Sequence, residues 1–370
     1  MLAPRPSRAR RLPTCVALAV VLLLATAATA AAASWSSASR LHTSREFHPA
    51  TALPDGRVLV SGGFSFSGIQ ASAELFDPKA GRWQNTFPMS SARFAHTSTL
   101  LADGRVLVAG GANLGDGYVA PAELFDGTAE TWQPAGQLRR ARANHTASLL
   151  ADGRVLVAGG LARNHTELRS AEIYDPATNS WSRAGSMRAA RYHHTATTLP
   201  DGRVLVTGGD HEEDDFLRSA EIYDPRRNRW TRARSMRRVR GNHSSLLLPN
   251  GRVLVAGGGA RTPGFTKGAE LYDPVRNRWR DAGNMKAARG FHIAALLPRG
   301  QVLVAGGFAD SGTLRGAELF DPATNRWRRT TPLRRARAHA SVAVIGDRVL
   351  VAGGGVVSGR IVPTAELYTP

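Results

Sequence analysis

The 370-residue chain has one cysteine, and only three of its 48 cationic residues are lysines. Cys15 lies in the N-terminal segment, so the rest of the chain can form neither a disulfide nor a thiolate metal site. Arginine therefore supplies nearly all of the net charge of +19. Long uncharged apolar runs are scarce as well, and the clear one spans residues 16–33. These absences exclude disulfide-stabilised folds and cysteine-based chemistry.

The N-terminal segment, residues 1–33, predicts a signal peptide. It has a basic start, an apolar run over residues 16–33 and three small residues for cleavage at 31–33. A membrane anchor is the alternative, but no stop-transfer flank follows the apolar run. We therefore expect a chain that begins near Ser34, is secreted, periplasmic or held at the cell surface, and has no stable membrane insertion.

The positive charge predicts non-specific attraction to polyanions. Sequence-specific nucleic-acid binding is not expected, because the arginines recur along the whole chain and form no single basic stripe with interleaved aromatic residues. For an exported chain, the expected partners are a protein, an acidic glycan or another surface polymer.

A repeat of about 49 residues organises the chain after residue 33. Seven Gly-Gly pairs lie 47 to 49 residues apart. The pairs begin at Gly62, Gly110, Gly159, Gly208, Gly257, Gly306 and Gly353. Each ends an apolar run such as Val155 to Ala158, and each is followed by Ala-Glu-Leu/Ile-Phe/Tyr. Such a period predicts one domain, residues 34–370, built from stacked units.

Each unit predicts four antiparallel strands. In one unit they are residues 145–150, 154–158, 171–175 and a strand marked by Trp181, with Asp-Gly as the tight turn between the first two. A diglycine, then a Tyr-like aromatic, then Trp at fixed spacing resembles the kelch motif. The resemblance implies an all-β fold, a seven-bladed β-propeller. The last unit lacks its Trp, so the N-terminal strand at Trp35 should close the ring.

The resemblance to kelch proteins extends to the propeller of galactose oxidase, whose copper-radical cofactor needs a cysteine crosslinked to a tyrosine. That activity is not expected here, because Cys15 is the only cysteine. A sialic-acid mutarotase is another exported kelch-like protein, but that family has six blades. We expect no cofactor and no catalytic residues, and a monomeric binding scaffold that uses its variable loops. A carbohydrate-active or carbohydrate-binding protein, mutarotase-like or lectin-like, is the alternative.

Three polar residues recur in every unit and are interpreted as structural. An arginine precedes the first strand and a glutamate begins the third, so buried Arg-Glu pairs are predicted. The arginines are Arg45, Arg93, Arg142, Arg191, Arg240, Arg289 and Arg337, and the glutamates are Glu74, Glu123, Glu172, Glu221, Glu270, Glu318 and Glu366. Seven histidines, each fourteen residues before a diglycine, are expected to hydrogen-bond within their own blades. They are His48, His96, His145, His194, His243, His292 and His339.

The residues between each arginine and histidine break the repeat. They should surround the mouth of the channel, and the last unit keeps only Ala338 there. The candidate binding residues are Phe47, Phe94, Asn144, Tyr192, His193, Asn242 and Phe291. Aromatic rings and amides suit sugars, which stack on the former and hydrogen-bond to the latter. Inert filling of the channel entrance is the alternative.

One loop after a diglycine is acidic. It contains His211, Glu212, Glu213, Asp214 and Asp215, which offer oxygen ligands for a hard cation such as calcium. The run lacks the glycine-assisted turn and the alternating ligand spacing of a calcium loop. A solvated acidic loop facing a basic surface is therefore the favoured interpretation, and no metal site is predicted elsewhere.

Overall fold

The computed structural model describes Met1 and residues 33–113, 117–211, 215–260 and 264–370. Residues 33–370 form one compact unit. The expected signal peptide, apart from Met1 and Ala33, lies outside the described residues, and so do Glu212, Glu213 and Asp214 of the acidic loop. Within the described part, no helix has the length and apolar character needed to span a membrane.

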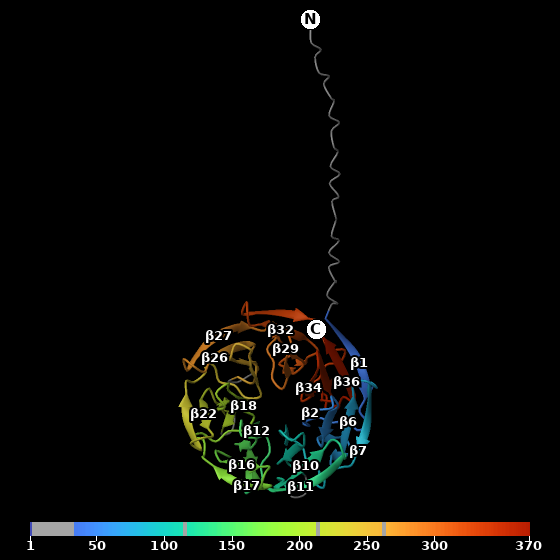
Figure 1. Cartoon of the computed structure of the whole chain (residues 1–370), viewed down its shortest axis with the longest axis vertical. Coiled ribbons are helices and arrows are strands. Elements are labelled where there is room, and N and C mark those ends of the chain that lie inside the picture. The colour runs from blue at the N-terminus through green and yellow to red at the C-terminus, as the bar shows by residue number, and fades with distance from the viewer. Residues whose placement is uncertain (2–32, 114–116, 212–214, 261–263) are drawn as a thin grey trace. The chain divides into compact units, whose positions relative to one another are not determined.

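Seven four-stranded antiparallel sheets surround a central axis, and Figure 1 shows β2, β12, β18 and β34 near the centre of the ring. From the axis outward, blade 1 contains β2 (Ala50–Ala52), β3 (Val58–Ser61), β6 (Ala73–Asp77) and β7 (Arg82–Thr86). Blade 2 contains β8 (Thr97–Leu100), β9 (Val106–Ala109), β10 (Pro121–Asp126) and β11 (Thr131–Gln137). Blade 3 contains β12 (Thr146–Leu149), β13 (Val155–Ala158), β16 (Ala171–Asp175) and β17 (Ser180–Ala184).

The remaining blades follow the same order. Blade 4 contains β18 (Thr195–Thr198), β19 (Val204–Thr207), β22 (Ala220–Asp224) and β23 (Arg229–Ala233). Blade 5 contains β24 (Ser244–Leu247), β25 (Val253–Ala256), β26 (Gly268–Asp273) and β27 (Arg278–Asn284). Blade 6 contains β28 (Ile293–Leu296), β29 (Val302–Ala305), β32 (Ala317–Asp321) and β33 (Arg326–Thr330). Blade 7 contains β34 (Ser341–Ile345), β35 (Arg348–Ala352), β36 (Thr364–Thr369) and β1 (Ser34–Arg40).

Short hairpins extend four of the connections between second and third strands. They are β4 (Phe64–Ser65) with β5 (Gly68–Ile69), β14 (Leu161–Ala162) with β15 (Thr166–Glu167), β20 (Asp210–His211) with β21 (Asp215–Phe216), and β30 (Phe308–Ala309) with β31 (Gly312–Thr313). The 3₁₀ helix η1 (Arg163–His165) lies between β14 and β15. We call the end of the propeller that carries these connections the loop face, and the opposite end, with the tight hairpin turns, the turn face.

The N-terminal strand closes the ring, as the sequence predicts. β1 pairs antiparallel with β36, and Trp35 lies opposite Tyr368. The two rings are 5.0 Å apart, and Trp35 Nε1 donates to the Thr331 carbonyl of blade 6 at 2.8 Å. The innermost strands then contact one another in a closed circle that begins and ends at β2. The first and last strands of the propeller are therefore held in one blade.

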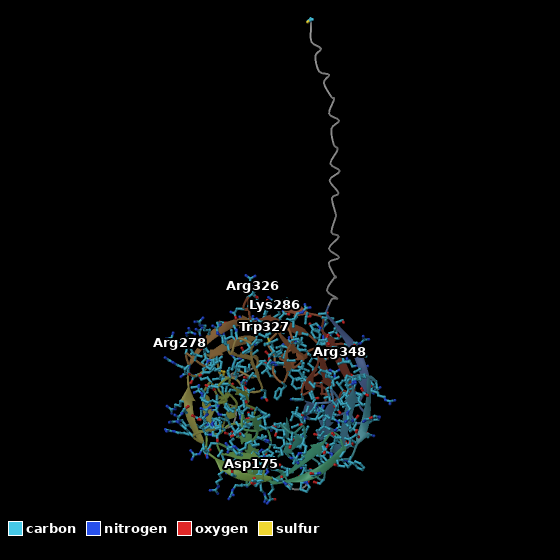
Figure 2. All side chains as sticks on the ribbon, in the orientation of Figure 1. Asp175, Arg278, Lys286, Arg326, Trp327 and Arg348 are labelled. Carbon is cyan, nitrogen blue, oxygen red and sulfur yellow. The ribbon has the colours of Figure 1, made fainter. Side chains whose placement is uncertain are left out.

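The second strand of each blade is the most buried, because sheets pack against both of its faces. In blade 3, Val155, Leu156 and Val157 are at most 1% exposed. The outer strands add arginines, and Figure 2 shows Arg278 and Arg326 projecting outward from the ring. Charge therefore accumulates on the rim, while the apolar strands fill the interior.

The predicted Arg-Glu pairs are present in all seven blades. Arg142 Nη2 lies 2.7 Å from Glu172 Oε1, and both side chains are at most 3% exposed. Arg142 Nη1 also donates to the Gly159 and Ser170 carbonyls, and Glu172 accepts the backbone N–H groups of Arg139 and Arg140. The equivalent pairs in the other six blades have N–O distances of 2.6 to 3.0 Å. These charges are neutralised within the fold.

Candidate functional site

Seven residues form a closed backbone ring at the mouth of the channel on the loop face. We call them the mouth ring: Phe47, Ala95, Asn144, His193, Asn242, Phe291 and His339, all with φ between 49° and 54°. Each N–H donates to the carbonyl of the ring member in the preceding blade at 2.9 to 3.3 Å, and Phe47 donates to His339. The left-handed conformation recurs once per blade, so it is a property of the ring itself.

The structure separates the seven sequence-predicted mouth residues into two positions. Phe47, Asn144, His193, Asn242 and Phe291 belong to the mouth ring. Phe94 and Tyr192 lie one residue earlier, where each forms an antiparallel bridge with the residue after its own diglycine, Ala112 and Asp210. All seven lie on the loop face, but Phe94 and Tyr192 are not members of the mouth ring.

The sequence-based alignment of the last unit is wrong. Ala338, His339 and Ala340 correspond to Glu46, Phe47 and His48, because Ala338 bridges Gly355 as Glu46 bridges Phe64. His339 is therefore a mouth residue, and Ala340 stands where the other blades have their histidine. The turn between β34 and β35 is one residue shorter than its counterparts in the other blades. A count of fourteen residues back from the diglycine therefore reaches His339 instead of Ala340.

The six remaining histidines join neighbouring blades, and the expectation that they bond within their own blades is wrong. His194 Nε2 lies 2.9 Å from Thr146 Oγ1 of the preceding blade. The other five make equivalent contacts with Ser or Thr hydroxyls at 2.8 to 3.3 Å. Burial lowers the pKa of His194 well below its ordinary value, and the Arg191 charge lowers it further. The histidines are thus neutral structural links.

Aromatic side chains meet around the mouth ring. Phe47 stacks on His339 with ring centroids 3.8 Å apart, and Phe291 contacts His339 edge-to-face at 4.4 Å. Phe291 also lies 6.0 Å from His193, two blades away. These contacts draw side chains from blades 1, 4, 6 and 7 together, so part of the mouth is filled by its own residues.

Two histidine-carboxylate pairs border the same ring. His193 Nδ1 lies 2.8 Å from Asp210 Oδ2, and His339 Nδ1 lies 3.5 Å from Glu46 Oε2. Burial lowers the pKa of His339, while the Glu46 carboxylate opposes that shift. Glycines make room for both carboxylates, because a Cβ on Gly241 would collide with Asp210 and one on Gly355 with Glu46. The mouth therefore offers imidazole, carboxylate and amide groups beside aromatic rings.

A pocket of about 730 Å³ opens beside the mouth on blades 3 and 4, and we call it the Tyr192 pocket. It is lined by Leu161, Asn164, His165, Glu167, Ala190, Tyr192 and His211. His211 Nδ1 lies 2.7 Å from Glu167 Oε2, which joins β20 to β15. Asn164 and His165 have positive φ within η1, so the backbone there is held in an uncommon conformation.

Sequence reasoning missed Asn164, His165 and Glu167 as site residues. The only signal was that the loop over residues 161–170 differs from its counterparts in the other units. Of the acidic loop, His211 pairs with Glu167, and its backbone pairs with Asp215 across the β20–β21 hairpin. The carboxylates of Glu212, Glu213 and Asp214 lie outside the described residues.

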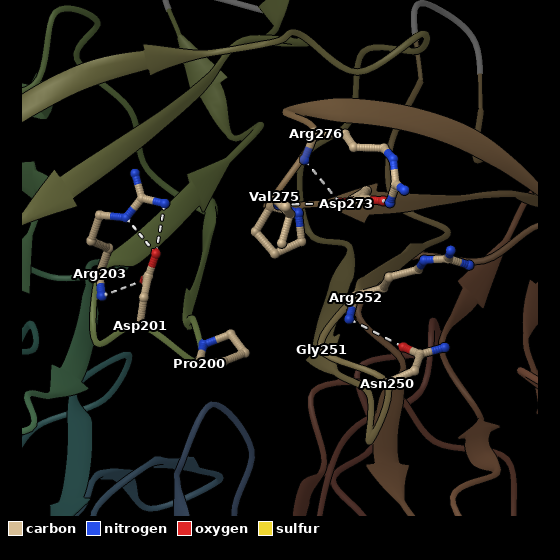
Figure 3. A pocket seen from close by; sticks show the side chains of 10 residues that line it. Pro200, Asp201, Arg203, Asn250, Gly251, Arg252, Asp273, Val275 and Arg276 are labelled. Atoms are coloured by element: carbon tan, nitrogen blue, oxygen red, sulfur yellow. Dashed lines mark hydrogen bonds and ion pairs between the residues drawn. The ribbon is translucent and has the colours of Figure 1, made fainter.

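The turn face also has a pocket, of about 370 Å³, between blades 4 and 5 (Figure 3). Its charges are paired locally: Arg203 lies 2.6 Å from Asp201, and Arg276 lies 3.1 Å from Asp273. The backbone N–H of Arg276, with other local donors, lowers the pKa of Asp273. Similar Asp-Arg pairs at 2.7 Å recur in the turns of blades 1, 2 and 3. This pocket is therefore formed by turn residues of a kind that recurs in several blades, and we do not assign it a binding role.

The diglycines, the blade-joining Trp and His residues and the buried Arg-Glu pairs define a kelch-type β-propeller. The chain belongs to the family described as the KLHDC2/KLHL20/DRC7 Kelch-repeats domain, whose model matches residues 95–282 and 183–354. No curated protein sequence matches the chain. Among solved structures, a fungal alcohol oxidase of the AA5 family, in complex with copper, superimposes with a TM-score of 0.76 at 21% identity, over 91% of this chain and 76% of that one.

The oxidase comparison shows the shared fold alone. In the part of the chain that the structure describes, no group of three or more His, Cys, Asp or Glu side chains is placed to hold one metal ion. The single cysteine, Cys15, lies outside that part. Among the described residues, the histidine-carboxylate sets on the loop face are pairs: His193 with Asp210, His339 with Glu46, and His211 with Glu167. A pair of donors does not fit a copper centre.

Proposed function

We propose that this kelch propeller is a non-catalytic binding protein that contacts its partner through the loop face. One observation carries the proposal. Buried side chains that recur in the units, such as Arg142, Glu172 and His194, form bonds within and between blades, whereas the residues of the mouth ring and the Tyr192 pocket differ from unit to unit. A binding face built from variable loops on a rigid frame is the usual arrangement for propellers and similar scaffolds.

A carbohydrate ligand is the second candidate, and the Tyr192 pocket favours it. Tyr192 offers a ring for stacking, while Asn164, Glu167 and His211 offer hydrogen-bonding groups around one cavity. The pocket is of the size that holds a small ligand. Bridging of Glu167 to His211 orients both side chains before a ligand arrives, which lowers the entropy cost of binding.

The cellular setting is part of the proposal. The basic start and the apolar run over residues 16–33 support export and a periplasmic, secreted or surface location. The partner there would be a protein, an acidic glycan or another surface polymer, and the propeller would act as a monomer.

Binding of the purified protein to neutral and acidic glycans at two salt concentrations tests the proposal. We expect salt-resistant binding to at least one glycan, and a loss of tenfold or more in affinity, about 1.4 kcal/mol, for Tyr192→Ala. The matched control is Phe66→Ala, which removes another aromatic ring, 70% exposed, from the hairpin of β4 and β5. If Phe66→Ala weakens binding as much as Tyr192→Ala does, or if binding disappears in salt for every glycan, the Tyr192 pocket is not the site.

A further inference from the structure

A second loop-face cavity, of about 580 Å³, lies at the joint between blades 4 and 5. We call it the joint pocket. It is lined by Arg218, Arg237, Arg238, Val239, Ala260 and Thr266. The Met236 N–H donates to the Arg218 carbonyl at 2.8 Å, which fixes Arg218 beside Arg237. The backbone N–H groups of Arg237 and Arg238 donate to the buried Glu270 carboxylate, so the backbone that carries these arginines is anchored.

Three guanidinium groups line this pocket, and no carboxylate of the described residues pairs with them. Arg218, Arg237 and Arg238 are exposed, and none of them forms an ion pair with a described carboxylate. Glu270, which accepts the backbone N–H groups of Arg237 and Arg238, also accepts a bond from Arg240 Nη2 at 2.8 Å. Among the described residues, the positive charge of the pocket is therefore unbalanced and is carried on a fixed backbone, which favours an anion.

The wall of this joint contains a polar residue, Thr266, at a position that is Gln70 in blade 1 and apolar in the other five blades. Thr266 occupies the position held by Leu217 in blade 4 and Leu314 in blade 6, as the matching backbone bonds to the diglycines show. Thr266 Oγ1 accepts the Gly268 N–H at 3.0 Å, and its hydroxyl hydrogen has no acceptor among the described residues. Thr266 can therefore donate to a ligand oxygen.

Gly268, two residues after Thr266, leaves space in the wall for the Arg238 side chain. A Cβ on Gly268 would lie 3.2 Å from Arg238 Nε and 3.3 Å from Thr266 Oγ1. Blade 7 has Thr364 at this position, and its hydroxyl accepts from Arg337 Nη2. The glycine thus leaves room for the Arg238 side chain to pack close to Thr266.

We propose that Arg218, Arg237, Arg238 and Thr266 bind a tetrahedral oxyanion, the sulfate or phosphate ester group of a larger ligand. Guanidinium forks match such oxygens with paired, charge-assisted hydrogen bonds, and the threonine hydroxyl supplies one further donor. The cavity is larger than an inorganic ion needs, which leaves space for the group that carries the ester. This site is separate from the Tyr192 pocket, and the proposal stands without it.

The joint between blades 6 and 7 supplies a matched control. Arg315, Arg334 and Arg335 occupy the positions of Arg218, Arg237 and Arg238, and Glu366 accepts their backbone N–H groups as Glu270 does. The wall differs, because Val362 and Thr364 replace Thr266 and Gly268. Both joints therefore have the same three arginines, but only the joint between blades 4 and 5 has the polar, open wall.

The test is a calorimetric titration of the full chain with inorganic sulfate and inorganic phosphate at constant ionic strength. We expect saturable binding that weakens at least tenfold in an Arg218→Gln, Arg238→Gln double variant and less than twofold in an Arg315→Gln, Arg335→Gln double variant. Unfolding midpoints of both variants should match the parent, since all four side chains are exposed. Equal weakening in the two double variants, or no saturation in the parent, would overturn the proposal.

Two further arms sharpen the assignment. Thr266→Val should weaken the binding of either anion about threefold or more, because it removes the hydroxyl donor without changing the charge. Unchanged binding would contradict the placement of the anion against Thr266. Glucose 6-sulfate and glucose 6-phosphate then distinguish the two ester classes, and the tighter of the two identifies the source. If both sugar esters bind more weakly than the free ion, an ester ligand is refuted.

Discussion

Acid should destabilise this propeller steeply, because its buried histidines are neutral in the folded state. Burial lowers the pKa of the six histidines that join the blades, to about 3 for His145 and His292. In the unfolded chain each returns to an ordinary pKa near 6.5. A lowered folded pKa means that stability is complete above the unfolded pKa and is lost as pH falls below it towards the folded pKa.

The magnitude follows from the number of histidines. Each imidazole that stays neutral on folding but is protonated on unfolding reduces the free energy of unfolding by about 1.4 kcal/mol per pH unit below 6.5. Six together give about 8 kcal/mol per pH unit, which is comparable to the entire stability of a typical domain. We therefore expect the protein to be folded at pH 7.5 and to approach unfolding near pH 5.5.

Denaturant unfolding, followed by tryptophan fluorescence from pH 8 to pH 5.5, measures this effect. The change of the unfolding free energy with pH gives the number of protons taken up, and we expect about six. His194→Gln should lower that number by one, whereas Thr146→Val, which removes the hydroxyl partner and no titrating group, should leave it unchanged. A proton uptake of one or less between pH 6.5 and 5.5 would refute the reasoning.

Three further substitutions, one of them a control, test the frame by denaturant unfolding. Glu172→Gln should lower the free energy of unfolding by about 3 kcal/mol, because it leaves the buried Arg142 charge uncompensated. Arg154→Gln, the control, should lower it by less than about 1 kcal/mol, because the pair with Asp152 is exposed. Similar losses for both variants would contradict this contrast. Trp35→Ala should lower the free energy of unfolding by about 3 to 5 kcal/mol, because Trp35 packs on Tyr368 and hydrogen-bonds to blade 6. A decrease below about 1 kcal/mol would mean that β1 contributes little to ring closure.

The fold could be predicted from the sequence because the same residue pattern occurs in seven consecutive units. The diglycines and aromatic spacings gave seven blades, and the isolated Trp35 indicated closure by the N-terminal strand, which the pairing with β36 confirms. The direction of the histidine bonds could not be predicted. Spacing within a unit is the same whether His194 bonds to its own blade or to Thr146 of the preceding one.

The candidate site was predicted less completely, for two physical reasons. At the mouth, a one-residue difference in a turn displaced the alignment, so His339 was placed in the wrong set. The Tyr192 pocket and the joint pocket both form where loops of adjacent blades meet, and the contacts there depend on side-chain direction rather than on the repeat. Asn164 and Glu167 become site residues only beside Tyr192 and His211 of the next blade. Thr266 and Gly268 do so only beside arginines from the preceding one.

The most direct test of binding through the loop face is amide hydrogen exchange of the protein with and without the glycan that binds it most tightly. Binding through the loop face predicts protection in peptides that contain Asn164 to Glu167, Tyr192 and His211. Protection confined to turn-face peptides around Asp201 and Asn250, or no glycan that changes exchange at all, would contradict it.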